Sequence, residues 1–257
     1  MPDANTFQMA TRLGFAARGL LYATIGFLAL YSGRTENPGD TLAYLASGTG
    51  RLIVAAMAVG FFGYGVWRLI ESWVDSEGRG DDGKGIAIRL AGAVSGLVHF
   101  GLGVAAALLA AGEKGGGGDA SQTGAATALD WPGGGVLLYA IAAALIATGL
   151  FQLRKGWTLS FLRHLEPRAA RQGWVAWLGR LGHLARGLVF LLIGWFLFDA
   201  ARTDSASAAG GIGEALSALP ATPQMAVAGG LFLFGLFSLV EARYRHLANP
   251  HAFGGAS

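Results

Sequence analysis

Long apolar segments alternate with short polar segments along the whole chain. Six of the apolar segments are 16–22 residues long, at 13–31, 52–73, 90–111, 136–153, 181–200 and 225–240. About twenty apolar residues in a helix, rising 1.5 Å per residue, cross the roughly 30 Å hydrocarbon core of a bilayer. None of the seven prolines lies inside a segment. The pattern predicts an all-α, polytopic integral membrane protein with six transmembrane helices.

The first apolar segment returns twice in recognisable copies. Arg12, Arg89 and Arg180 align, and glycines follow each arginine after seven and fourteen residues: Gly19 and Gly26, Gly96 and Gly103, Gly187 and Gly194. The even-numbered segments also align, through Gly65, Gly149 and Gly235. The chain therefore reads as one membrane domain, 1–257, built from three hairpin repeats at 12–75, 89–158 and 180–245. Because each repeat crosses the membrane twice, we expect a compact ring with pseudo-threefold symmetry about the membrane normal.

The polar links between the spans differ in character. The segments 75–85 and 113–119 are rich in glycine and charge and are typical of flexible connectors. The link 154–179 is long and basic. Short segments with helical spacing precede each even span, at 41–46, 125–129 and 213–219, and we interpret them as interfacial helices.

Composition and charge agree with the membrane class. Hydrophobic residues make up 53% of the 257 positions and charged residues only 14%, with a net charge of +3. Fifteen of the nineteen lysines and arginines fall on one side of the predicted membrane, and only Arg34, Arg51, Lys114 and Arg202 fall on the other. The positive-inside rule then predicts that both termini are cytoplasmic. The basic residues are used for orientation, so we expect no nucleic-acid binding.

The repeated motifs resemble a known family. Arg-Leu-Gly-x-x-Ala-Arg-Gly opens the first and third copies, and a Gly-Leu/Val-Trp/Phe pattern closes the even segments. This pattern, from Arg12 to Arg245, resembles the bacterial membrane family catalogued as domain of unknown function 1206. The resemblance implies a multi-pass protein of the bacterial plasma membrane and brings no reaction with it. The second copy departs from the pattern, with Ser95 in place of Arg18 and Arg186.

The repeated glycines are candidate helix-packing positions. Residues seven apart lie on one face of a helix, and small residues there let neighbouring helices approach closely. We therefore expect Gly19, Gly26, Gly96, Gly103, Gly187 and Gly194 at helix contacts. A pore lined by small residues would need a similar spacing, and packing is the preferred interpretation.

One histidine lies deep inside a predicted span. His99 is about ten residues into the third span, so it is a candidate intramembrane polar site. A haem or metal would need a second ligand at the same depth, and His183 lies only three residues into its predicted span. We expect His99 to be buried and neutral, hydrogen-bonded inside the bundle. Neither a metal nor a cofactor is predicted.

Two ion pairs are predicted from the repeats themselves. Arg18 and Glu71 lie at similar depths from the cytoplasmic face, and the third repeat has the same combination in Arg186 and Glu241. The second repeat changes both positions together, to Ser95 and Lys155. A lone charge near the hydrocarbon edge is costly, so joint loss suggests pairing of Arg18 with Glu71 and of Arg186 with Glu241. The pairs either staple the helices or form a cytoplasmic gate or anion site.

The sequence carries no recognisable catalytic signature. It has no cysteine, no nucleotide-binding loop and no nucleophile motif, so we expect no enzymatic activity. Two classes of function remain. One is a small transporter or pore-like protein; the other is a structural or accessory subunit of a membrane assembly, or a lipid-binding protein. The expected partners are membrane lipids, anionic at the cytoplasmic face, and another membrane protein, while the oligomeric state stays open.

Overall fold

The computed structural model describes residues 4–75, 80–113 and 120–246. Its six long helices are α1 (Ala4–Ser32), α3 (Arg51–Val74), α4 (Gly83–Ala111), α6 (Gly134–Thr158), α8 (Gly173–Thr203) and α10 (Ala221–Tyr244). Each contains a span long and apolar enough to cross a membrane, with a mean hydropathy between 1.6 and 2.1. The six predicted spans and the all-α membrane class are confirmed.

Three helices, α1, α4 and α8, begin seven to nine residues before the spans that the hydropathy pattern predicts. Helix α4 begins at Gly83, where the Asp82 carboxylate accepts a hydrogen bond from the Gly85 amide at 2.7 Å and caps the helix. Helix α8 begins at Gly173, eight residues before the predicted span. The basic link is therefore shorter and contains η2 (Ser160–His164) and α7 (Pro167–Ala170). The glycine-rich run 114–119, predicted as a connector, lies outside the described residues.

The three short segments before the even spans are helical, as predicted. They form α2 (Pro38–Leu45), α5 (Ala120–Leu129) and α9 (Ile212–Ser217), accompanied by η1 (Gly48–Gly50) and η3 (Ala206–Ala208). The Glu214 carboxylate accepts hydrogen bonds from the Gly211 amide at 2.7 Å and from Asn37 Nδ2 at 3.1 Å. These bonds join the start of α9 to the link after α1. Location of the three helices at the membrane surface stays a prediction.

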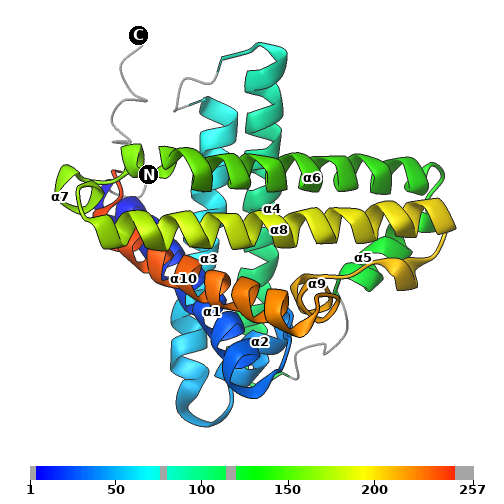
Figure 1. The fold of residues 1–257 in the computed structure, drawn as a ribbon, viewed down its shortest axis with the longest axis horizontal. Coiled ribbons are helices and arrows are strands. Elements are labelled where there is room, and N and C mark those ends of the chain that lie inside the picture. The colour runs from blue at the N-terminus through cyan, green and yellow to red at the C-terminus, as the bar shows by residue number, and fades with distance from the viewer. Residues whose placement is uncertain (1–3, 76–79, 114–119, 247–257) are drawn as a thin grey trace.

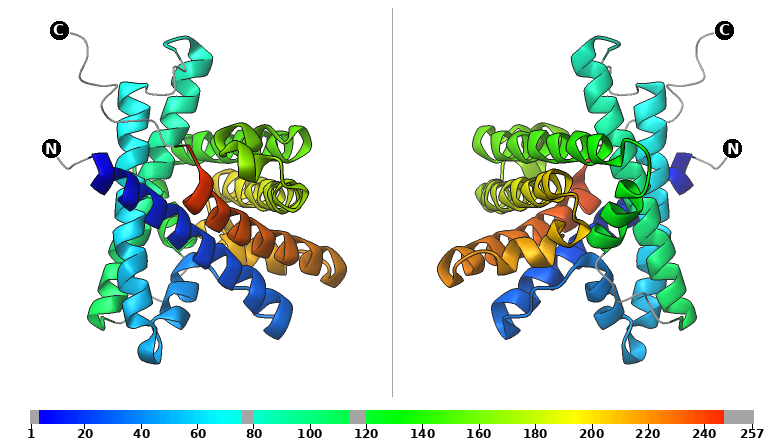
Figure 2. Two further views of the ribbon diagram at one scale, coloured as in Figure 1. Left: turned by 90° about the vertical axis from the view of Figure 1, so that its left-hand side faces the viewer. Right: turned by 90° about the vertical axis from the view of Figure 1, so that its right-hand side faces the viewer.

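The long helices are arranged in three layers of two (Figures 1 and 2). One outer layer holds α3 and α4, the other holds α6 and α8, and α1 with α10 lies between them. In Figure 1, α6 and α8 run across α3 and α4, and α1 and α10 run diagonally. The packing order is therefore α4, α3, α1, α10, α8, α6. The largest apolar core surrounds the central layer and includes Ile25, Phe61 and Leu231, each fully buried.

Each closely packed layer joins the even span of one repeat to the odd span of the next. The same glycine positions meet in all three layers: a Cβ on Gly96 would lie 3.0 Å from the Gly65 carbonyl, one on Gly187 2.9 Å from that of Gly149, and one on Gly19 2.9 Å from that of Gly235. The other three predicted glycines, Gly26, Gly103 and Gly194, lie against the same neighbouring helices. The threefold repetition therefore recurs in the pairing of helices, including the pair that joins the third repeat to the first.

The second hairpin is open, so the helices do not form the compact ring that we expected. In the first and third repeats, glycines bring the two spans together: a Cβ on Gly60 would lie 2.5 Å from the Leu13 carbonyl, and one on Gly182 would lie 2.6 Å from Phe234 Cα. The equivalents of Gly60 and Gly182 in the second repeat are Ala144 and Ala91, both exposed. Helices α4 and α6, which carry them, share no extended contact. The two extra methyl groups would not fit the contact made in the other repeats.

Candidate functional site: a buried charge centre

Arg18, the central residue of α1, is buried and fully engaged. Its guanidinium donates from Nη2 to Glu241 Oε2 at 2.6 Å, from Nη1 to the Tyr64 hydroxyl at 3.1 Å and from Nε to Ser238 Oγ at 3.3 Å. Only 6% of Arg18 and 5% of Glu241 are exposed. This ion pair links the first repeat to the third through α1 and α10.

Glu241 is shared between two arginines. Its second oxygen, Oε1, accepts a hydrogen bond from Arg245 Nη1 at 2.5 Å, one helical turn further along the chain. Both carboxylate oxygens of Glu241 thus accept charged hydrogen bonds. Such bonds offset the cost of burying its charge away from water. Two guanidinium groups and one carboxylate leave the group of three with a formal charge of +1.

The partners differ from the two predicted pairs. Arg18 binds Glu241 instead of Glu71, and Glu71 pairs with Arg68 on its own helix. The reason is that each odd helix packs most closely on the even helix of the preceding repeat. By the same rule, the position opposite Arg186 is Lys155, so the predicted pair of Arg186 with Glu241 is also wrong. The joint change to Ser95 and Lys155 therefore affects two different helix contacts.

Arg186 is held by aromatic rings. Its guanidinium carbon lies 4.7 Å from the centre of the Phe190 ring, 4.8 Å from that of Phe234 and 5.4 Å from that of Tyr22, all within the range of cation–π contacts. No carboxylate of the described residues lies within ion-pair distance of Arg186, and its buried Nε has no hydrogen-bond partner there. The aromatic rings therefore hold the Arg186 guanidinium in position, but no carboxylate neutralises its charge.

The Phe234 ring lies between the two repeated arginines. It is buried, with the Arg18 guanidinium carbon 5.4 Å from its centre and that of Arg186 at 4.8 Å. Tyr22 meets the same ring edge-on at 5.1 Å. The two arginines that distinguish the first and third repeats thus converge on one ring, although they come from different layers. Together with Glu241 they form a cationic centre inside the bundle.

His99 is buried, as expected, and 7% of it is exposed. Its Nδ1 lies 2.7 Å from the Ser95 carbonyl, and its ring lies 4.4 Å from the Tyr64 ring, centre to centre. Among the described residues there is no group of three or more histidine, cysteine, aspartate or glutamate side chains able to hold a metal ion. Neutrality of His99 stays a prediction.

His183 is a buried polar residue that the sequence interpretation undervalued. Because α8 begins at Gly173, His183 lies ten residues into its helix, and only 6% of it is exposed. The rings of Phe161, Phe234 and Phe237 surround it at 5.0–5.5 Å. Both ring nitrogens lack a hydrogen-bond partner in the described structure. The apolar period around Val175 could have extended the predicted helix and revealed its depth.

The three repeats match a known family of proteins. A family model described as Domain of Unknown Function (DUF1206) matches residues 13–75, 90–159 and 181–245, which coincide with the three repeats. An uncharacterised protein of Bacillus subtilis (strain 168), YxxB, is 27% identical over 249 residues, which covers 92% of this chain and 90% of that protein. No solved structure matches.

Proposed function

This chain belongs to the family described as Domain of Unknown Function (DUF1206), and we propose that it is a small membrane transporter for anions, with Arg18 and Arg186 at the anion site. The chain is a multi-pass membrane protein by its six apolar helices. The proposal includes no catalytic step and no cofactor.

The observation that carries the proposal is the charge of Arg186. Arg186 is half-buried. A cation without a carboxylate in a membrane-spanning helix is costly, and such residues are retained where they serve a pathway or a ligand. The Glu241 carboxylate balances the charge of Arg18. The Arg186 guanidinium contacts aromatic rings instead, and its buried Nε has no hydrogen-bond partner among the described residues. An anion bound at the Arg186 guanidinium would neutralise the excess charge and accept a hydrogen bond from that nitrogen.

The packing of the layers supports movement around this site. The outer layers, α3 with α4 and α6 with α8, each contact the central layer, while α4 and α6 are not packed together. The contacts between layers contain glycines, where the helix backbones approach closely. Rocking of one outer layer against the centre would open a route to Arg186 without breaking a buried ion pair.

Transport is tested in liposomes containing the purified full chain. We expect uptake of at least one of three labelled anions, chloride, phosphate and acetate, above that of empty liposomes. Arg186→Gln should lower this uptake by about 10–100-fold, since a hydrogen bond to a charged group contributes about 1.5–3 kcal/mol. Arg202→Gln, at the exposed end of α8 where the side chain is 60% accessible, is the matched control and should transport normally. Uptake unchanged by Arg186→Gln would contradict the proposal.

A structural or accessory role is the second candidate. The bonds from Arg18 and Arg245 to Glu241 hold α1 against α10, as a purely stabilising cluster would. Under this alternative, the wild-type protein would carry none of the three anions, and Arg186→Gln would alter only stability or assembly with another membrane protein. The liposome measurement therefore separates the two candidates.

We also propose that the protein lies in the bacterial plasma membrane with both termini in the cytoplasm. The support is the distribution of basic residues, fifteen on one side and four on the other. Because the chain has no cysteine, single cysteines report topology cleanly. A cysteine replacing exposed Asp130 should react with an impermeant maleimide added to intact cells. One replacing exposed Arg171 should react only after permeabilisation, and the reverse pattern would exclude this orientation.

A further inference from the structure

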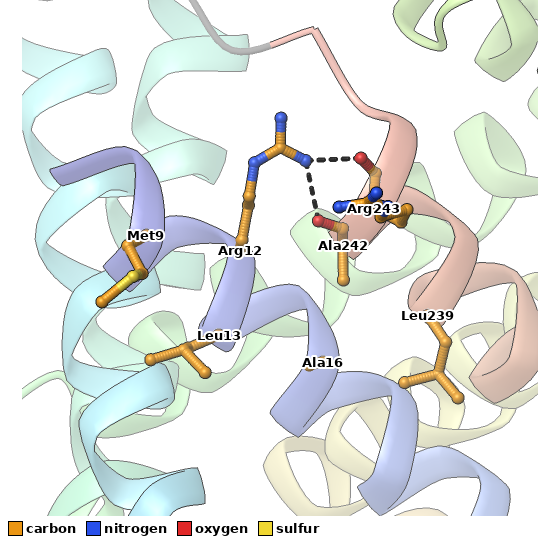
Figure 3. Close-up of a pocket in the computed structure, with 7 residues that line it drawn as sticks. All are labelled: Met9, Arg12, Leu13, Ala16, Leu239, Ala242 and Arg243. Carbon is orange, nitrogen blue, oxygen red and sulfur yellow. Dashed lines mark hydrogen bonds between the residues drawn. The ribbon is translucent and has the colours of Figure 1, made fainter. Parts of the chain in front are cut away.

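An apolar groove runs between the first part of α1 and the last part of α10 (Figure 3). Leu13 and Leu239 form its walls and are 39% and 41% exposed. Ala16 and Ala242 line it between them, and their small side chains leave the groove open. Its volume is about 330 Å³, at the lower end of the range of sites that hold small organic molecules.

Two arginines stand at one end of this groove. Arg12 Nη1 donates hydrogen bonds to the carbonyls of Ala242 at 2.9 Å and Arg243 at 2.7 Å, where α10 ends. These bonds fix the Arg12 guanidinium across the mouth of the groove, as Figure 3 shows. Arg243 lines the same end and is exposed. Neither arginine forms an ion pair with a carboxylate of the described residues.

We propose that this groove binds one anionic phospholipid from the cytoplasmic leaflet. An acyl chain lies between Leu13 and Leu239, and the phosphate lies between Arg12 and Arg243. The proposal depends on the cytoplasmic location of these helix ends and not on anion transport.

The chemistry favours a lipid over other occupants. The walls are apolar and the cationic groups are confined to one end, which matches the division of a phospholipid into tail and headgroup. A free phosphate would use the arginines but leave the apolar walls without a partner. Arginines at the cytoplasmic end of membrane helices attract anionic headgroups, whereas a zwitterionic headgroup offers no net charge.

Binding can be measured by titrating the full chain, in nonionic detergent, with a fluorescent phosphatidylglycerol and with a phosphatidylcholine of the same chain length. We expect tighter binding of phosphatidylglycerol. Arg243→Gln should weaken its binding about fivefold, because each basic residue near anionic lipid contributes about 1 kcal/mol. Arg171→Gln, an exposed arginine in the link before α8, removes the same charge elsewhere and should leave binding unchanged.

Ala16→Leu tests the groove itself, because it fills the space without changing charge. It should weaken binding of both lipids while the melting temperature stays close to that of the wild type. Equal losses in Arg171→Gln and Arg243→Gln would show diffuse surface attraction and overturn the proposal. So would undiminished lipid binding in a folded Ala16→Leu protein, or displacement of the lipid by millimolar inorganic phosphate at constant ionic strength.

Discussion

Replacing Glu241 by glutamine is expected to lower the free energy of unfolding by about 3–5 kcal/mol, because it leaves the buried guanidinium of Arg18 and the half-buried one of Arg245 without their carboxylate. Arg18 and Arg245 each bond one oxygen of Glu241, at 2.6 and 2.5 Å, and the glutamate side chain is 6% exposed. Chemical unfolding in detergent micelles measures the difference. An effect below about 1 kcal/mol, the value of an exposed pair, would contradict the buried-cluster account.

Two further variants make this first test specific. Asp199→Asn removes the carboxylate of the exposed pair with Arg202, so it should cost less than about 1 kcal/mol. The double variant Arg18→Gln with Glu241→Gln should be more stable than the sum of the single effects predicts, since it removes both partners of one bond. Strict additivity would show that the two side chains do not interact.

Alanine at Gly26 should destabilise the protein by about 1–3 kcal/mol through overpacking. The added Cβ would lie 2.5 Å from the Phe232 amide nitrogen and 2.6 Å from the Ala228 carbonyl oxygen, and backbone atoms cannot turn aside as a side chain can. Alanine at Gly101 meets nothing within 4 Å. Because alanine favours a helix over glycine by about 0.5–1 kcal/mol, that variant should be neutral or more stable.

The measurement for this second prediction is the difference in unfolding free energy between the two alanine variants in the same detergent. Gly26→Ala should lower the unfolding free energy, whereas Gly101→Ala should leave it unchanged or raise it, although the chemical change is identical. A Gly26→Ala protein as stable as the wild type would mean that α1 and α10 are further apart than described.

The spans and the packing faces could be predicted because both follow from periodicity within one segment. The length of an apolar segment predicts that it crosses the membrane, and glycines seven residues apart predict a close contact with another helix. The identity of the neighbouring helix does not follow from this local pattern. Gly19 was correctly expected at a contact, yet nothing in its own segment specified α10 as the partner.

The ion pairs depend on the identity of the neighbouring helix. Glu71 and Glu241 occupy equivalent repeat positions, so sequence alone could not decide which of them meets Arg18. The choice depends on which helix packs most closely on α1, and that helix is α10 of the third repeat. A signal was present in Ala91 and Ala144, which replace the glycines of both closed hairpins. Aligning these positions would have indicated an open second repeat.

The burial of His183 could not be predicted for a different reason. The hydropathy pattern marks the hydrocarbon core, while helix α8 continues for eight residues before the predicted span. Trp174 and Trp177 in this extension are amphipathic side chains that suit the membrane interface. His183 lies only three residues from the start of the predicted span, so the hydropathy pattern places it near the membrane surface. Tertiary packing nevertheless buries it among three phenylalanines.

The central claim is that Arg186 offers its charge to an anion, and equilibrium stability tests it most directly. A ligand that binds only the folded protein stabilises it, by about 2.7 kcal/mol at a hundred times its Kd. We predict that the melting temperature of the wild type rises when at least one of chloride, phosphate and acetate replaces gluconate at constant ionic strength, and that Arg186→Gln removes the rise. An equal rise in both proteins, or none in the wild type, would contradict the claim.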